Sequence, residues 1–99
     1  MPPALRLDKW LWFARLCKTR SLAQALIDSG AVRVNGAPAF KSSTILRPGD
    51  EVLVPQGRSW RRVRVVDSGK RRGPASEAQR LYDELSPPAI SPDGELTFP

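Results

Sequence analysis

The sequence predicts an α+β fold in which two short helices pack on a small, mostly antiparallel sheet, followed by a C-terminal helix. Apolar residues recur at helical spacing over residues 7–17 and again over 22–27. Asn35-Gly36 is the dipeptide that a tight two-residue hairpin prefers. Strand-like stretches follow at 51–54 and 60–66. A chain of 99 residues has room for one domain with one modest core.

The first helix follows a loose, proline-containing lead-in at residues 1–5. Asp8 lies in its first turn, where a carboxylate complements the free N–H groups. Trp12 and Leu16 fall opposite the apolar stripe. They either stack on nucleic-acid bases or are covered by another element of the chain. The stripe itself, which faces the core, consists of Leu7, Trp10, Leu11, Ala14 and Cys17.

The joint between the two helices is the segment Lys-Thr-Arg-Ser at residues 18–21. Thr19 or Ser21 can cap the second helix, and Ser21 with Gln24 forms a capping-box pattern. The N–H groups at this helix start, together with Lys18 and Arg20, can also receive a phosphate. Both functions are compatible with each other.

The sheet is predicted to begin after Gly30, which closes the second helix. Residues 32–34 alternate in the manner of a half-buried strand and lead into the hairpin turn. In the stretch 60–66, Val63 and Val65 face inward. The opposite face is either a solvated edge strand or a binding surface, because it carries Trp60, Arg62 and Arg64.

The C-terminal third begins with a basic, glycine-flanked loop at 69–74 that contains Lys70, Arg71 and Arg72. A capping-box pattern at Ser76 starts the last helix, which the apolar spacing extends to residue 85 within the segment 67–86. This helix is a candidate cover for the Trp12 side of the first helix. Residues 87–99 are proline-rich without periodicity, which predicts a disordered tail.

The charge is distributed unevenly along the chain. The sequence contains 16 Lys and Arg against 10 Asp and Glu, and all of the basic excess lies in residues 1–72. Most of these cations are Arg, whose planar fork binds phosphate and base edges. This pattern favours nucleic acid over an anionic membrane as the partner.

Several classes of function are excluded by what the sequence lacks. It contains no histidine and only one cysteine, so it supplies no His-based general base, zinc knuckle or disulfide framework. No phosphate-binding loop motif of the G-x-x-x-x-G-K type occurs. We therefore expect no enzymatic activity, no metal and no cofactor. The lone cysteine, with neither a secretory pattern nor a membrane-length apolar run, predicts a cytoplasmic protein.

The spaced motif of residues 6–54 resembles the RNA-binding domain named after the fourth small-subunit ribosomal protein. It comprises R-L-D-K-W-L at 6–11, Arg15, T-R-S at 19–21, Gly30, V-x-V-N-G at 32–36, Lys41 and P-G-D at 48–50. The D-K-W-L-W form of the first helix and R-R-G-P-A-S-E-A at 71–78 are similar to small bacterial heat-shock proteins that bind ribosomes. The basic C-terminal extension usual in that family is replaced here by an acidic, proline-rich end.

The resemblance implies a core motif at 6–54 within an RNA-binding domain at 6–66. It also implies binding to ribosomal RNA of the free large subunit that carries a stalled nascent chain on peptidyl-tRNA, with a role in rescue and recycling under heat stress. Apart from the resemblance, we expect a monomer, and the sequence leaves open whether DNA is bound as well as RNA. The positions that the family uses for RNA are Arg6, Lys9, Arg15, Lys18, Thr19, Arg20, Arg33, Asn35 and Lys41.

Two other classes of function remain as alternatives. In a protein-interaction adaptor, Trp60 and the last helix would form an apolar docking surface. In a general nucleic-acid binder, the same basic array would act on RNA or DNA elsewhere in translation. A secondary basic surface is also predicted, formed by Arg62, Arg64, Lys70, Arg71 and Arg72.

Overall fold

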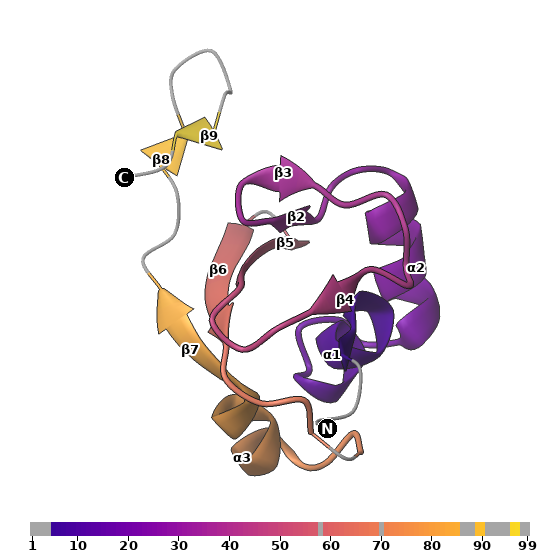
Figure 1. Ribbon diagram of the computed structural model, residues 1–99, viewed down its shortest axis with the longest axis vertical. Helices are drawn as coiled ribbons and strands as arrows, with labels where there is room; N and C mark the ends of the chain where they lie inside the picture. Colours follow the sequence, from indigo (N-terminus) through magenta and orange to yellow (C-terminus); the bar gives the residue numbers. More distant parts are fainter. Residues whose placement is uncertain (1–4, 58, 70, 86–88, 91–95, 98–99) are drawn as a thin grey trace.

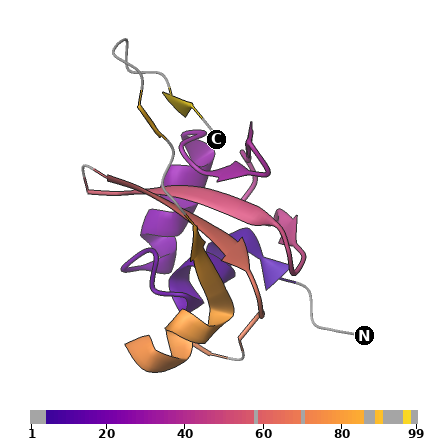
Figure 2. The same ribbon diagram turned by 90° about the vertical axis from the view of Figure 1, so that its left-hand side faces the viewer.

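The computed structural model describes residues 5–57, 59–69, 71–85, 89–90 and 96–97, and it confirms the predicted α+β class (Figure 1). Helices α1 (Leu7–Phe13) and α2 (Arg20–Asp28) lie on one side of a five-stranded antiparallel sheet in the order β3-β2-β5-β6-β7 (Figures 1 and 2). Its strands are β2 (Arg33–Val34), β3 (Ala37–Pro38), β5 (Glu51–Gln56), β6 (Ser59–Val65) and β7 (Tyr82–Leu85).

The remaining elements are short. Strand β1 (Leu5–Arg6) pairs with β4 (Ile45–Leu46), and β8 (Ala89–Ile90) pairs with β9 (Leu96–Thr97). Helix α3 (Ala75–Ala78) continues directly into the 3₁₀ turn η1 (Gln79–Leu81), which leads into β7.

The core lies between the two helices and the sheet. Val34, Val52 and Val63 are cross-strand neighbours in register; Val52 and Val63 belong to the core cluster, and half-buried Val34 packs against it. Val65 is also buried, so the predicted inward face of β6 is confirmed. The helices contribute their predicted apolar stripe, of which Trp10 is 1% exposed and Leu11 0%.

Helix α1 ends at Phe13 rather than near residue 17. Arg15 has φ of 59°, a left-handed conformation that interrupts the helix. The N–H groups of Leu16 and Cys17 both donate to the Leu11 carbonyl and turn the chain inward. Leu16 is only 3% exposed as a result, so it belongs to the core cluster rather than to the side opposite the apolar stripe, and the chain itself covers it.

Helix α2 begins one residue after its cap. The Thr19 hydroxyl accepts a hydrogen bond from the Leu22 N–H at 3.0 Å. The alternative capping box of Ser21 and Gln24 does not form, because Gln24 donates its side-chain amide to Asp8 instead. The helix closes as expected at Gly30, whose φ is +79°.

The predicted helix over 76–85 was wrong beyond residue 81. Tyr82–Leu85 forms β7 and pairs with β6, with Tyr82 opposite Val65. This pairing satisfies backbone groups that an edge strand would leave free, so β6 lies inside the sheet. Tyr82 also packs edge-on against Trp10, with ring centroids 6.4 Å apart.

The two ends of the chain differ in part from the prediction. Leu5, expected in a loose lead-in, belongs to β1 and is 7% exposed; residues 1–4 lie outside the described residues. Within the predicted disordered tail, 89–90 and 96–97 form a short antiparallel pair, and the rest lies outside the description. No helix among the described residues is long and apolar enough to cross a membrane.

Candidate nucleic-acid interface

A buried carboxylate lies at the centre of the predicted basic surface. Asp8 is 0% exposed, although it lies in the first turn of α1. Its Oδ1 accepts from Arg6 Nε at 3.1 Å and from the Lys9 N–H at 2.9 Å. Its Oδ2 accepts from Arg20 Nε and Gln24 Nε2, both at 3.1 Å. We call Arg6, Asp8, Arg20 and Gln24 the Asp8 cluster.

The two arginines of the Asp8 cluster are held in place but remain accessible. Their side chains are 42% and 37% exposed, against 0% for Asp8. Arg20 contacts the carboxylate through Nε, which leaves its terminal nitrogens without a hydrogen-bond partner among the described residues. Such groups can donate to a phosphate in the bidentate geometry that arginine favours.

Asp8 is ionised at neutral pH. Burial raises its pKa, but hydrogen bonds from Gln24, Arg6, Arg20 and the Lys9 N–H lower it by more, so the pKa lies below its usual value of 3.8. One buried negative charge therefore faces two arginines, and the Asp8 cluster retains a net positive charge.

A turn at residues 41–44 packs against the start of α1. The Leu7 N–H donates to the Thr44 carbonyl at 2.8 Å, and the Asp8 N–H donates to the Ser42 carbonyl at 3.3 Å. This places Lys41 near the Asp8 cluster, and the exposed Lys9 follows Asp8 in the chain. Four of the predicted RNA-binding cations thus come from segments that meet at the start of α1, namely Arg6, Lys9, Arg20 and Lys41.

The joint between α1 and α2 is held by residues 67–69 and 71–73, which we call the strap. Arg15 donates through Nε to the carbonyl of buried Gly73 at 2.7 Å. Arg72 donates to the carbonyls of Trp12 at 3.2 Å and Lys18 at 3.4 Å. Its guanidinium also lies 5.7 Å from the centre of the Trp12 ring. The loop before α3 therefore covers Trp12. The sequence analysis had predicted the last helix as the candidate cover.

These contacts change the roles of several predicted residues. Arg72 belongs to the strap rather than to an open basic surface. Thr19 uses its hydroxyl as the cap of α2. Lys18 is exposed in the joint, and its side chain has no hydrogen bond or ion pair with the part of the chain that the structure describes.

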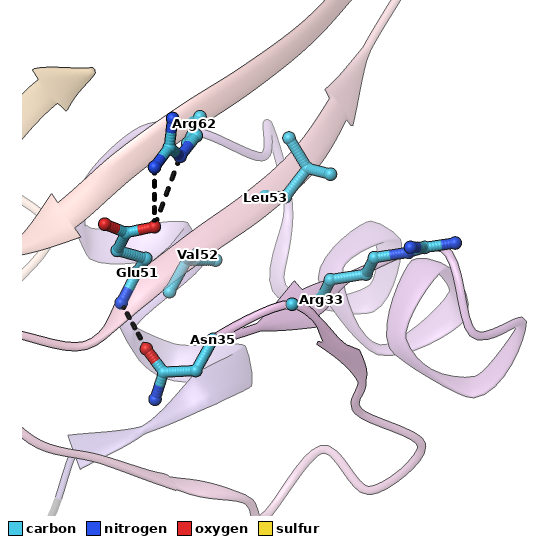
Figure 3. A pocket seen from close by; sticks show the side chains of 7 residues that line it. Arg33, Asn35, Glu51, Val52, Leu53 and Arg62 are labelled. Carbon is cyan, nitrogen blue, oxygen red and sulfur yellow. Dashed lines mark hydrogen bonds and ion pairs between the residues drawn. The ribbon is translucent and has the colours of Figure 1, made fainter. Parts of the chain in front are cut away.

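Asn35 is a structural residue of the β2–β3 hairpin. It has φ of 52°, followed by Gly36 at +85°, as the predicted turn requires. Its side-chain oxygen accepts from the Glu51 N–H at 2.9 Å, and its amide group donates to Asp50 at 3.2 Å. Both polar groups are therefore engaged, and the contact with the Glu51 N–H joins the hairpin to β5 (Figure 3).

Arg33 lies on the face of the sheet away from the helices. Arg33 of β2 lies opposite Leu53 of β5, and Leu53 lies opposite Arg62 of β6. The next row of side chains, Val34 and Val52, faces the core. Arg33 and Arg62 line an open pocket of about 310 Å³, in which the Arg33 side chain points away from Arg62 (Figure 3). The structure thus separates Arg33 from the Asp8 cluster.

The secondary basic surface is largely compensated by carboxylates. Arg62 and Arg64 both pair with Glu51, at 2.9 and 3.5 Å. Arg71 pairs with Glu77 at 3.0 Å. Lys70 lies outside the described residues. These pairs leave less net charge for a polyanion than the Asp8 cluster and its neighbours offer.

Sequence reasoning missed the roles of Asp8 and Gln24. Asp8 was interpreted as a helix-start residue and Gln24 as part of a capping box. The only signal was the position of Asp8 beside Leu7 and Leu11 at the border of the apolar stripe, where a carboxylate becomes buried and needs partners.

The fold and this clustered basic surface define an RNA-binding domain of the S4 type. Residues 5–52 match the S4 domain family, which confirms the resemblance drawn from the sequence. A solved structure of Heat Shock Protein 15 from Vibrio cholerae, described as trimeric, superimposes with a TM-score of 0.80. It has 39% identity and covers 85% of this chain and 84% of that one.

Curated relatives give the narrower assignment. Heat shock protein 15 of Escherichia coli K12 is 45% identical over 82 residues, and the match spans 83% of this chain but 61% of that protein. The RQC P-site tRNA stabilizing factor of Bacillus subtilis is 43% identical over 81 residues, covering 82% and 92%. The chain belongs to the family of Heat Shock Protein 15 and the RQC P-site tRNA stabilizing factors, and its residues 5–52 match the S4 domain.

Proposed function

We propose that this protein is a non-catalytic RNA-binding protein of the translation machinery. Its target is ribosomal RNA of the free large subunit that carries a stalled nascent chain on peptidyl-tRNA, and binding aids rescue and recycling under heat stress. The observation that carries the proposal is the Asp8 cluster. A fully buried carboxylate that orders two accessible arginines serves a polyanion better than it serves stability alone.

The charge balance around the helices supports a polyanionic partner. The predicted primary set contains seven cations, and in the described residues Asp8 is the one carboxylate that pairs with any of them. In contrast, the arginines of β6 pair with Glu51 and Glu84. Phosphates bound at the helical surface would therefore displace solvent counterions rather than internal partners.

The names of the relatives support the choice of partner. One group is named for stabilizing P-site tRNA, and the other for heat shock. A surface that binds RNA by charge and shape suits both ribosomal RNA and an adjacent tRNA. We also propose that the protein is cytoplasmic and monomeric. Light scattering of the purified chain measures the oligomeric state.

The test is sedimentation of a cell lysate through a sucrose gradient. We expect the protein to travel with free large subunits and to leave that fraction when salt is raised or RNA is digested. Travel with no ribosomal fraction would contradict the proposal. Retention of a protein partner after nuclease treatment would instead favour an adaptor.

A pair of variants localises the interface. Lys9→Ala removes an exposed cation beside the Asp8 cluster, whereas Arg80→Ala removes an exposed cation of η1 at the same cost in net charge. We expect Lys9→Ala to weaken ribosomal RNA binding about three- to tenfold, with little change in melting temperature. An equal loss in Arg80→Ala would show that only net charge matters.

A further inference from the structure

A second recognition element lies beside the helix joint. An open cleft of about 350 Å³ separates the joint from the end of the β5–β6 hairpin. One side of the cleft is formed by Leu16 of the joint and by Leu22 and Leu26 of α2. The other side is formed by the hairpin residues Pro55, Gln56 and Gly57. Leu22 is 43% exposed, whereas most large apolar residues of the described chain are buried.

The mouth of this cleft is cationic. Arg15 and Lys18 line it together with the leucines. The strap holds the Arg15 side chain, whose Nε donates to the Gly73 carbonyl at 2.7 Å, and it holds the Lys18 backbone, whose carbonyl accepts from Arg72 at 3.4 Å. Cys17 also lines the cleft, and burial raises its pKa to about 11, so it adds no charge there. An apolar slot beside one guanidinium held in place and one exposed ammonium matches a planar base that carries a phosphate.

We propose that this cleft receives one unstacked base of the bound RNA, with the adjoining phosphate held by Lys18 and Arg15. The inference rests on the proposed RNA-binding function and adds a site to it. A volume of about 350 Å³ is at the small end of ligand pockets, which suits a single nucleotide rather than a larger ligand. Proteins that recognise folded RNA commonly take up bases splayed out from loops and bulges. The Gln56 amide supplies a donor and an acceptor for a base edge.

The test compares three eight-nucleotide probes, namely oligo(A), oligo(U) and an abasic ribose-phosphate chain of the same charge. We expect the wild-type protein to bind the base-bearing probes more tightly than the abasic one. Leu22→Ala should lower affinity for the base-bearing probes about three- to tenfold, because one packed base is lost, and should leave abasic binding unchanged. Alanine is a good helix former, so α2 should persist.

Two further variants keep the result interpretable. Leu22→Met preserves an apolar wall and should retain the preference for bases. Val66→Ala truncates an apolar residue of matched exposure, 45%, that does not line the cleft, and should behave as wild type. Equal binding of abasic and base-bearing probes by the wild type, or equal losses in Leu22→Ala and Val66→Ala, would overturn the base site while leaving RNA binding intact. Failure of the wild type to bind any of the three probes would overturn the base site, and the sucrose gradient decides separately whether the proposed RNA-binding function fails with it.

Discussion

At the scale of single residues, Asp8 determines how the arginines are presented. Arginine side chains on a surface normally lose conformational freedom when they bind a ligand, which weakens binding. Here the carboxylate holds both guanidinium groups before any ligand arrives, Arg6 through Nε and one terminal nitrogen and Arg20 through Nε. Part of the ordering cost is therefore met during folding, and the remaining N–H groups are available to phosphate.

Asp8→Asn separates this ordering effect from net charge. The substitution removes a negative charge, so electrostatics alone predicts tighter RNA binding. If ordering dominates, we expect RNA affinity to fall about threefold or more, since an amide oxygen accepts from the arginines less strongly. Filter binding at fixed salt measures the change, with Asp28→Asn, an exposed carboxylate of α2, as the matched charge control. Tighter binding in both variants would refute the ordering role.

The pH dependence of stability provides an independent measurement. The Asp8 pKa is lower in the folded protein than its usual value of 3.8, so the unfolded chain binds the proton first as pH falls. The stabilisation is fully present above the unfolded pKa and is lost as pH falls through the folded pKa. Urea unfolding between about pH 6 and pH 2 should show this loss in the wild type and a shallower loss in Asp8→Asn. Parallel curves would contradict a role for Asp8.

The sequence predicted cations in the R-L-D-K and T-R-S segments, which the structure places around Asp8; their contact with RNA stays a prediction. It could not show which of them would meet. Gln24 reaches Asp8 across 16 positions, and Arg15 reaches Gly73 across 58. Such contacts depend on tertiary packing, which local spacing does not encode. For the same reason the sequence did not show that Arg33 lies on the face of the sheet opposite the helices.

At the scale of elements, the strap replaces helical structure as the support of the α1–α2 joint. The joint between Ala14 and Thr19 lacks regular structure, and left-handed Arg15 costs backbone energy that its contact with Gly73 offsets.

The predicted last helix is also changed by a tertiary contact. Helical spacing over residues 76–85 was genuine, but pairing with β6 outweighed it after residue 81.

Arg72→Ala tests whether the strap positions the joint. We expect faster hydrogen exchange in residues 14–19 and a several-fold loss of RNA affinity, because the Trp12 and Lys18 carbonyls lose their donor. The slope of log affinity against log salt should stay the same, since Arg72 neutralises no phosphate. Arg71→Ala is the control, because Arg71 is exposed and pairs only with Glu77 among the described residues. A slope reduced by about one in Arg72→Ala would make it a direct phosphate ligand.

At the scale of the whole molecule, the two faces of the sheet differ in available charge. The helical side carries cations around one buried carboxylate, whereas the outer side pairs Arg62 and Arg64 with Glu51. The overall charge of +6 is therefore a poor guide to where a polyanion binds. Orientation on RNA should follow the helical side.

The salt dependence of binding measures this orientation. If about six phosphates are contacted, log affinity should fall against log salt with a slope of about −4 to −5. Lys9→Ala should reduce the slope by about 0.7 to 0.9, because it removes one phosphate contact. Arg62→Ala should leave the slope nearly unchanged, since Glu51 already compensates that guanidinium at 2.9 Å. Equal reductions in the two variants would mean that RNA also contacts the outer face of the sheet and that the molecule binds with both sides.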